Sequence, residues 1–254
     1  MIARPRPDAP LIGVTVELLD APFYEGRRRF QLFTDYLRCL RAAGLSAVLL
    51  PADAPAAEVA CWLPILDGLL LTGGDDPDLR PFGGPPPDEH CKPVPREQQE
   101  LGLALVRAAR ASGLPMLGVC LGMQFMGLAA GAPYCQHLEQ AEDHLKGVRH
   151  LVTARPGSRL AAIIGRAPIE VASYHHQALA GAGDGLAVAA TAPDGVVEAV
   201  EDSDHPFAIG VQWHPERLPE SPATRVLFSR FAAAAESYRR ARVGAATPPT
   251  VRDA

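Results

Sequence analysis

The sequence predicts an α/β protein in which an open, mostly parallel β-sheet is covered by helices on both faces. Two observations lead to this fold class. Apolar strand-like runs alternate with segments of helical period up to about residue 140, and the connections between most of them are short. After residue 145 the pattern changes to short strands separated by Gly, Pro and Asp turns. This change predicts a smaller antiparallel extension in the C-terminal half.

The first strands and helices can be placed in order. Residues 11–16 form an apolar strand, and apolar residues then recur at helical spacing up to Gly44, which predicts a helix opened by the basic run 27–29. We interpret that run as a solvated face, with steering of substrate carboxylates as the alternative. The next expected elements are a strand at 45–50, a short helix at 55–63 and a strand at 67–72. The residues at helical spacing in the first expected helix are Phe30, Phe33, Leu37 and Leu40.

A Gly- and Pro-rich segment, residues 73–95, follows the third strand. It is long for a connection in a compact domain, so we expect it to be an active-site loop. A helix at 97–110 then leads into an apolar strand at 114–119 and a helix at 123–130. The last expected helix covers residues 222–242.

Composition limits the classes of function. With 254 residues, of which 48% are hydrophobic, the chain can bury one substantial core, and we expect one domain over residues 10–242 with flexible tails at 1–9 and 243–254. A net charge of −5 gives no basis for binding nucleic acid or an anionic membrane. No signal peptide or membrane-spanning stretch is found, and five cysteines, an odd number, suggest the reducing cytoplasm. A homo-oligomer stays open.

The most informative motif is the sequence GVCLG at residues 118–122. A nucleophile flanked by glycines in this way is typical of a sharp strand-to-helix turn that lifts the side chain of Cys120 above the sheet. The helix N-terminus behind such a turn lowers the pKa of a thiol and offers free amides to an oxyanion. On this motif alone, an ordinary buried cysteine at the end of a core strand is about equally plausible.

A second motif, GVQWHPE at residues 210–216, supplies the partners that a thiol nucleophile needs. His214 follows an apolar strand and can accept the proton of the thiol. Glu216, two residues on, can fix the tautomer of the imidazole and support its positive charge. A His-Pro-Glu sequence alone is often a surface loop, but its presence together with the Cys120 turn favours a catalytic set.

Together these residues resemble the Cys-His-Glu triad of class I glutamine amidotransferases. Further matches narrow the resemblance to the gamma-glutamyl-gamma-aminobutyrate hydrolase-like branch, peptidase family C26, over roughly residues 10–235. The resemblance implies a flavodoxin-like domain with Cys120, His214 and Glu216 as catalytic residues. The further matches are residues 70–77, residues 95–97 with Glu100, residues 173–177 and residues 194–199.

The resemblance also implies binding residues. It makes the amides of Gly74 and Leu121 the oxyanion hole, although a Gly-Gly turn alone would be unremarkable. Gln124 resembles the family glutamine that contacts the glutamyl end of the substrate, with an exposed helix glutamine as the alternative. Three further residues, Tyr174, His175 and His176, are expected to present backbone and imidazole groups to the α-carboxylate, although adjacent histidines are otherwise often a turn or a metal fragment.

The charged residues near the long loop have no assigned role. Asp75, Asp76 and Arg96 could recognise the charged end of a glutamyl group, but exposed loop charges need no function. A zinc site built from His90, Cys91 and Cys135 is rejected because the spacing is not that of metal ligands. We expect no metal and no cofactor.

The sequence therefore predicts a cysteine hydrolase that cleaves a gamma-glutamyl amide to glutamate and an amine through a glutamyl thioester. Gamma-glutamyl-gamma-aminobutyrate is the leading substrate, since the resemblance implies amines from polyamine breakdown. The alternative is a glutaminase subunit that delivers ammonia to a synthase partner, because Leu121 replaces the arginine of many hydrolases of this branch. A non-enzymatic binding protein is disfavoured because all three triad positions are present.

Overall fold

The computed structural model describes residues 8–246 and contains one nine-stranded sheet flanked by helices. The strand order is β4-β1-β5-β6-β13-β12-β11-β8-β9. The first five strands in this order are parallel and the rest antiparallel. The parallel set consists of β4 (Ser46–Leu50), β1 (Leu11–Thr15), β5 (Gly68–Leu71), β6 (Met116–Val119) and β13 (Ala208–Val211). The predicted antiparallel extension is thus a continuation of the main sheet: β12 (Val197–Glu201), β11 (Ala187–Thr191), β8 (Val148–Ala154) and β9 (Ile169–Ser173).

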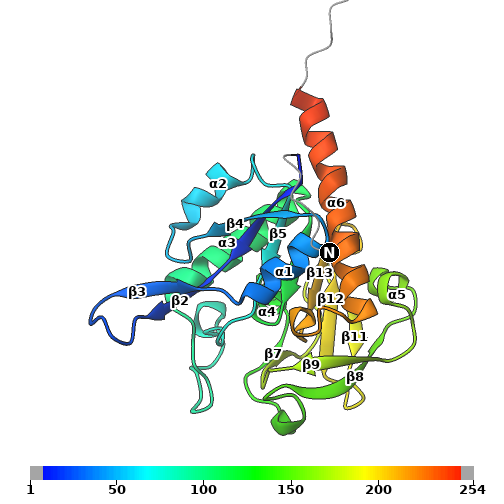
Figure 1. Ribbon diagram of the computed structural model, residues 1–254. Coiled ribbons are helices and arrows are strands. Elements are labelled where there is room, and N and C mark those ends of the chain that lie inside the picture. Colours follow the sequence, from blue (N-terminus) through cyan, green and yellow to red (C-terminus); the bar gives the residue numbers. More distant parts are fainter. Residues whose placement is uncertain (1–7, 247–254) are drawn as a thin grey trace, which may run out of the picture.

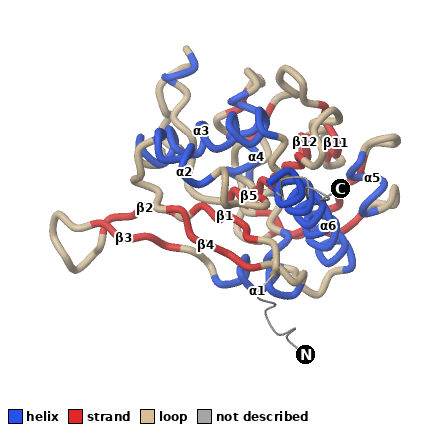
Figure 2. The backbone as a smooth tube through the Cα atoms, turned by 90° about the horizontal axis from the view of Figure 1, so that it is seen from above, coloured by secondary structure: helices blue, strands red, loops and turns tan. Residues whose placement is uncertain are grey.

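Helices cover both faces of this sheet, as expected (Figure 1, Figure 2). One core cluster joins the sheet to α1 (Thr34–Ala42), α5 (Arg159–Ile164) and α6 (Pro222–Ala246). The opposite cluster joins it to α2 (Val59–Trp62), α3 (Arg96–Ser112) and α4 (Leu121–Ala129). Successive residues of a strand point to opposite faces, and accordingly Leu70 packs in the first cluster while Leu69 and Leu71 pack in the second.

Two small two-stranded sheets lie outside the main sheet. β2 (Glu17–Asp20) and β3 (Arg28–Gln31) form a hairpin that projects from the molecule (Figure 2). β7 (Tyr134–Cys135) pairs with β10 (Ala178–Leu179). Four short 3-10 turns complete the chain: η1 (Ala56–Glu58), η2 (Arg80–Phe82), η3 (Ala141–Asp143) and η4 (Pro215–Arg217).

Two expectations about element boundaries are wrong. The basic run at 27–29 does not open a helix, because Arg28 to Gln31 pairs with β2 and the helix begins only at Thr34. The last helix does not end at residue 242 but continues to Ala246, through alanines that favour a helix. The other tail positions, 1–7 and 247–254, lie outside the described residues. Among residues 8–246, no helix combines the length and apolar character needed to cross a membrane.

Candidate active site

Cys120 lies in a strained turn between β6 and α4. Its φ is 50° and its ψ is −107°, a left-handed conformation that costs a non-glycine residue on the order of 1–3 kcal/mol. Its amide donates to the carbonyl oxygen of Val211 at 2.8 Å, which ties the turn to β13. A Cβ at Gly122 would lie 2.3 Å from the carbonyl oxygen of Leu71, so only glycine lets α4 start this close to β5.

His214 and Glu216 follow β13, the neighbour of β6. Nδ1 of His214 lies 2.7 Å from Oε1 of Glu216, and the Glu216 side chain is fully buried. Because a carboxylate accepts hydrogen bonds, Nδ1 carries the proton in this contact and Nε2 is left to serve a second partner. The amide of His214 donates to the carbonyl oxygen of Ala172 at 3.0 Å, which fixes the backbone beside β9.

The imidazole of His214 is basic in this setting. Burial alone lowers its pKa, but the negative charge of Glu216 and the proximity of Cys120 outweigh that effect and raise the pKa to about 10. The ring therefore holds a second proton at neutral pH. A charged imidazole that contacts a thiol and a carboxylate is the arrangement expected of an activated cysteine.

Gly73 marks the point where β5, the Cys120 turn and His214 meet. A Cβ built on Gly73 would lie 2.8 Å from Cε1 of His214 and 3.5 Å from Cβ of Cys120. The amide of Gly73 donates to the hydroxyl oxygen of Tyr36 on α1 at 3.0 Å. A side chain at Gly73 would occupy the space between the thiol and the imidazole.

Gly74 and Leu121, the expected oxyanion hole, lie side by side. A Cβ on Gly74 would be 2.9 Å from Cδ2 of Leu121. Among the described residues, the Gly74 amide makes no hydrogen bond, whereas that of Gly73 is occupied by Tyr36. Leu121 is the first residue of α4, where amides have no partner within the helix. Both amides can therefore donate to a bound oxygen.

Gln124 is buried, so the alternative of an exposed helix glutamine is wrong. Its Nε2 lies 3.4 Å from the carbonyl oxygen of Gln177 and 3.3 Å from Oε1 of Gln212. Gln212 in turn directs its Nε2 at the sulfur of Cys120, 3.5 Å away. The side chain of Gln124 thus supports a chain of amides that ends at the thiol.

The three residues after β9 separate in the structure. The Tyr174 ring packs edge-on against the His214 ring, with centroids 5.4 Å apart. His176 lies at the loop, with Nε2 3.2 Å from the carboxylate of Asp76. His175 turns away, because its imidazole is buried with its Nε2 3.3 Å from Oε1 of Glu198. The expectation that the His175 imidazole meets the substrate does not fit this burial, and we leave it out of the proposed site.

The long loop after β5 brings charged groups to the rim of the site. Asp75 pairs with Lys92 at 2.6 Å, and the Asp76 carboxylate accepts from the amide of Lys92. Arg96 pairs with Glu100 on the exposed surface of α3. On the hairpin side, burial and the charge of Asp75 raise the pKa of Glu17, whose Cγ lies 3.6 Å from a Cβ built on Gly74.

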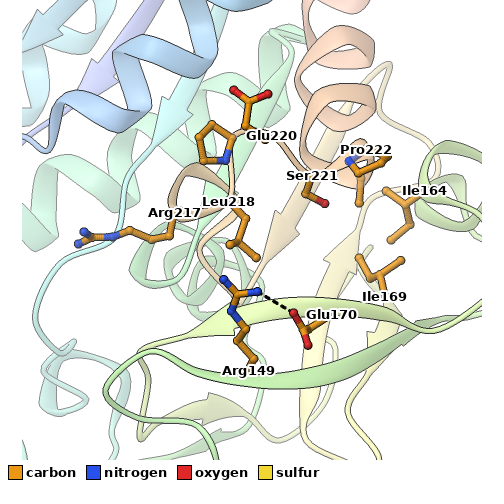
Figure 3. Close-up of a pocket in the computed structure, with 11 residues that line it drawn as sticks. Arg149, Ile164, Ile169, Glu170, Arg217, Leu218, Glu220, Ser221 and Pro222 are labelled. Atoms are coloured by element: carbon orange, nitrogen blue, oxygen red, sulfur yellow. Dashed lines mark hydrogen bonds and ion pairs between the residues drawn. The ribbon is translucent and has the colours of Figure 1, made fainter.

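A separate surface pocket lies between β8, β9 and the start of α6 (Figure 3). Its rim carries the ion pair of Arg149 and Glu170, at 2.8 Å. Arg217 belongs to its lining but points away from the other residues (Figure 3), and its guanidinium lies 4.3 Å from the ring centre of Phe33 and 5.2 Å from that of Tyr174. Because Cys120 and His214 do not line this pocket, it is not the candidate active site.

Sequence reasoning missed three residues that the fold brings to the site. Gln212 was inside a recognised motif but had no assigned role. Tyr36 and Glu17 lie far from the motifs in sequence, on α1 and β2, and no local pattern distinguishes them. Burial and the charge of Glu216 raise the pKa of Tyr36, so its hydroxyl stays neutral beside Gly73.

Comparison with known proteins identifies a family for the chain. A family model described as Peptidase C26 matches residues 10–216. A gamma-glutamyl-gamma-aminobutyrate hydrolase of Escherichia coli O157:H7 is 32% identical over 248 residues, 90% of this chain and 94% of that protein. A Mycobacterium tuberculosis protein provisionally named as a glutamine amidotransferase is 40% identical over 192 residues, and the match spans 72% of this chain but only 61% of that relative.

The fold is shared with solved structures. The glutaminase domain of Trypanosoma brucei CTPS, with bound acivicin, superposes with a TM-score of 0.63 at 19% identity and covers 90% of this chain and 94% of that one. The predicted fold class and the resemblance to the amidotransferase-like family are both confirmed.

Proposed function

Because this chain belongs to the peptidase C26 family and is a glutamine amidotransferase-like hydrolase, we propose that it cleaves a gamma-glutamyl amide with Cys120 as the nucleophile. One observation carries the proposal. A cysteine in a strained turn lies beside a buried histidine that a buried carboxylate holds at 2.7 Å. The gamma-glutamyl-gamma-aminobutyrate hydrolase of Escherichia coli, at 32% identity, supports this substrate class.

The proposed reaction has two halves. The Cys120 thiolate attacks the γ-carbonyl carbon, the C–N bond breaks, and His214 gives its proton to the leaving amine. His214, now neutral, takes a proton from water, whose oxygen attacks the glutamyl thioester. The C–S bond then breaks, glutamate leaves, and the thiolate and imidazolium are restored. Glu216 keeps the proton on Nδ1 throughout and is not itself protonated.

The amides of Gly74 and Leu121 stabilise the oxyanion that forms in each half. They are neighbours, and the Gly74 amide is not occupied by any described residue. Hydrogen-bond donors that are already positioned before reaction need no reorganisation when the charge develops. In the same site, the Gln212 amide directed at the Cys120 sulfur stabilises the thiolate.

The charges around the site fit a glutamyl group, which carries one ammonium and one carboxylate at its α-carbon. Glu17 and Asp75 lie on the side of Gly74 and suit the ammonium. Arg217, held over the rings of Phe33 and Tyr174 next to His214, suits the carboxylate. The amine half of the substrate would then extend toward the loop after β5.

The second candidate function is a glutaminase that delivers ammonia to a synthase. Leu121 favours it, because leucine at this position is equally typical of ammonia-supplying amidotransferases. The structural likeness to a glutaminase domain shows only the shared fold.

The deciding experiment measures glutamate release by the purified chain with a panel of substrates. The panel contains glutamine, gamma-glutamyl-aminobutyrate, gamma-glutamyl-polyamines and folate polyglutamates, and the Cys120→Ser variant is the blank. We expect release from a gamma-glutamyl amine and none from the blank. Release from glutamine alone would favour the glutaminase, and no release from any substrate would contradict the proposal.

A further inference from the structure

Three histidines and a glutamate converge in the antiparallel half of the sheet, outside the proposed active site. His144 follows η3, His150 lies on β8, His175 follows β9 and Glu198 lies on β12. Glu198 has 0% of its surface exposed, and His144 and His175 have 2% and 3%. Oε1 of Glu198 lies 3.4 Å from Nδ1 of His144, 3.5 Å from Nε2 of His150 and 3.3 Å from Nε2 of His175.

In His144 and His175, one ring nitrogen faces Glu198 and the other, outer nitrogen points away from it. The partner of the outer nitrogen decides which nitrogen carries the proton. Nε2 of His144 lies 2.8 Å from the carboxylate of Asp194, and Nδ1 of His175 lies 3.0 Å from the carbonyl oxygen of Gln177. Both partners are acceptors, so these nitrogens carry hydrogen. In a neutral imidazole the inner nitrogens, Nδ1 of His144 and Nε2 of His175, are then bare lone pairs, and both face Glu198.

Imidazole lone pairs and a buried carboxylate repel each other unless a positive charge lies between them. Within the described chain, the inner nitrogens of His144 and His175, both ring nitrogens of His150 and both oxygens of Glu198 have no hydrogen-bond partner. An unpaired buried carboxylate is strongly unfavourable, and buried charges are paired or coordinate a metal. The positive charge must therefore come from added protons or from a metal ion.

The distances favour a metal ion over protons. A charged imidazole that bonds a carboxylate directly brings the two atoms to about 2.7–2.9 Å, and His214 and Glu216 of this same protein lie at 2.7 Å. Two ligands at about 2.0–2.1 Å from a tetrahedral zinc ion are about 3.3–3.4 Å apart. The three nitrogen–oxygen distances of 3.3–3.5 Å match that second spacing.

We propose that His144, His150, His175 and Glu198 bind one transition-metal ion, and that this ion is zinc. All four ligand atoms lie within 4.8 Å of one another, and pairs wider than about 3.4 Å must draw together when a tetrahedral ion binds. Imidazole nitrogens with one carboxylate oxygen suit zinc, and four protein ligands make a closed structural site. Asp194 and the Gln177 carbonyl orient two of the ligands from behind, as outer partners of metal-bound histidines do. With neutral histidines, the charges of Glu198 and Asp194 balance a divalent ion.

The proposed ion takes no step in the reaction, but it holds the wall of the active site. The carbonyl oxygen of Glu198 accepts from the amide of Gln212, whose side chain lies 3.5 Å from the Cys120 sulfur. His175 is next to Tyr174, which packs on His214. The metal thus joins η3, β8, β9 and β12 behind both residues. This departs from the expectation, drawn from the sequence, that the chain needs no metal.

The test is the metal content of the full chain, measured by mass spectrometry after expression with added zinc. We expect about one zinc per chain for the wild type and for the control His90→Gln, and less than about a tenth for Glu198→Gln and His150→Gln. His90 is a suitable control because it lies on an exposed loop outside the cluster. Glu198→Gln is expected to fold without metal, since its amide can donate to the imidazole lone pairs.

A second measurement replaces zinc with cobalt after chelation. In the wild type we expect the visible spectrum of tetrahedral cobalt with nitrogen and oxygen ligands, and we expect Glu198→Gln to lose it. In thermal melts after chelation, added zinc should raise the Tm of the wild type but not that of Glu198→Gln. Less than about a tenth of an ion per chain after incubation with either metal would overturn the proposal. So would a thiolate-to-cobalt band, or metal retained in full by Glu198→Gln. None of these readouts depends on the enzyme's activity.

Discussion

At the residue scale, the proposed chemistry depends on a single thiol. Cys120→Ser or Cys120→Ala is expected to lower kcat by about 10³ or more, because oxyanion and binding contributions cannot replace the covalent step. The Tm should stay close to that of the wild type, since the change removes little side-chain volume. Glutamate release and a thermal melt on the same samples check this. Near-normal turnover would mean that another residue is the nucleophile.

The same thiol should be the most reactive one towards an electrophilic glutamine analogue. Burial raises the pKa of Cys39 to about 12 and that of Cys91 to about 11, so both stay protonated at neutral pH. Cys61 is exposed and Cys135 partly so, but neither lies in the candidate site. We expect peptide mapping to find the label on Cys120. If the label is found mainly on Cys61, it reports only the exposure of that thiol, and the active site does not recognise the analogue.

The pair of His214 and Glu216 predicts a pH dependence. The pKa of His214 is raised to about 10, so the proton needed by the leaving amine is present at neutral pH and is lost as the pH rises through that value. Glu216→Gln removes the main charge that raises this pKa. We expect the alkaline limb of kcat/KM to move to lower pH in Glu216→Gln, with measurable activity left, whereas His214→Ala keeps little. If the alkaline limb of kcat/KM stays at the wild-type pH in Glu216→Gln, or if both variants lose activity equally, the assigned role of Glu216 is contradicted.

At the element scale, the turn between β6 and α4 can be tested through its close contacts. Gly122→Ala places a methyl group 2.3 Å from the carbonyl oxygen of Leu71, so β5 and α4 must separate. We expect a loss of roughly 1–3 kcal/mol or more in the free energy of unfolding. Gly244→Ala is the matched control, because nothing lies within 4 Å of it and alanine favours a helix. Urea unfolding of both variants makes the comparison, and equal stabilities would contradict the contact.

The elements also show which strands and helices a local sequence pattern predicts. The strands at the centre of the sheet were predicted within a few residues, since burial on both faces leaves a continuous apolar run. The expected start of the first helix was wrong because Phe30 and Arg29 pair with β2, and helical spacing of aromatic residues does not exclude a hairpin. A long-range pairing decides that segment, and no local window contains it.

The residues of the candidate site also divide into those that a local motif predicts and those that it does not. Cys120, His214 and Glu216 could be found because each lies in a short motif next to a strand end. Tyr36 and Glu17 could not, since α1 and β2 reach the site only through the order of strands in the sheet. Gln212 lies in the motif of His214, but nothing in that motif shows that its side chain reaches the Cys120 sulfur. The histidine cluster draws its ligands from four separate segments, so its sequence spacing does not resemble that of a metal site.

At the scale of the whole molecule, the loop after β5 bears on whether the chain acts alone. The loop from Gly73 to Pro95 stays close to the site, with Asp76 bridged to His176 at 3.2 Å and the Asp76 backbone paired with that of Val94. Its residues come from the same chain as Cys120, and we expect them to close over a substrate without a partner. A free-standing hydrolase needs such a loop, whereas an ammonia donor needs a route into a synthase.

We therefore expect the purified chain alone to cleave gamma-glutamyl amides with an extended amine better than it cleaves glutamine. Burial of the methylenes of the amine would supply the preference, at ~0.8 kcal/mol for each one buried, or roughly fourfold in kcat/KM per methylene. A series of gamma-glutamyl alkylamines of increasing length measures that increment, and Cys120→Ser gives the background. Glutamine preferred over every member of the series, or activity that appears only after a partner protein is added, would favour the ammonia-donating glutaminase.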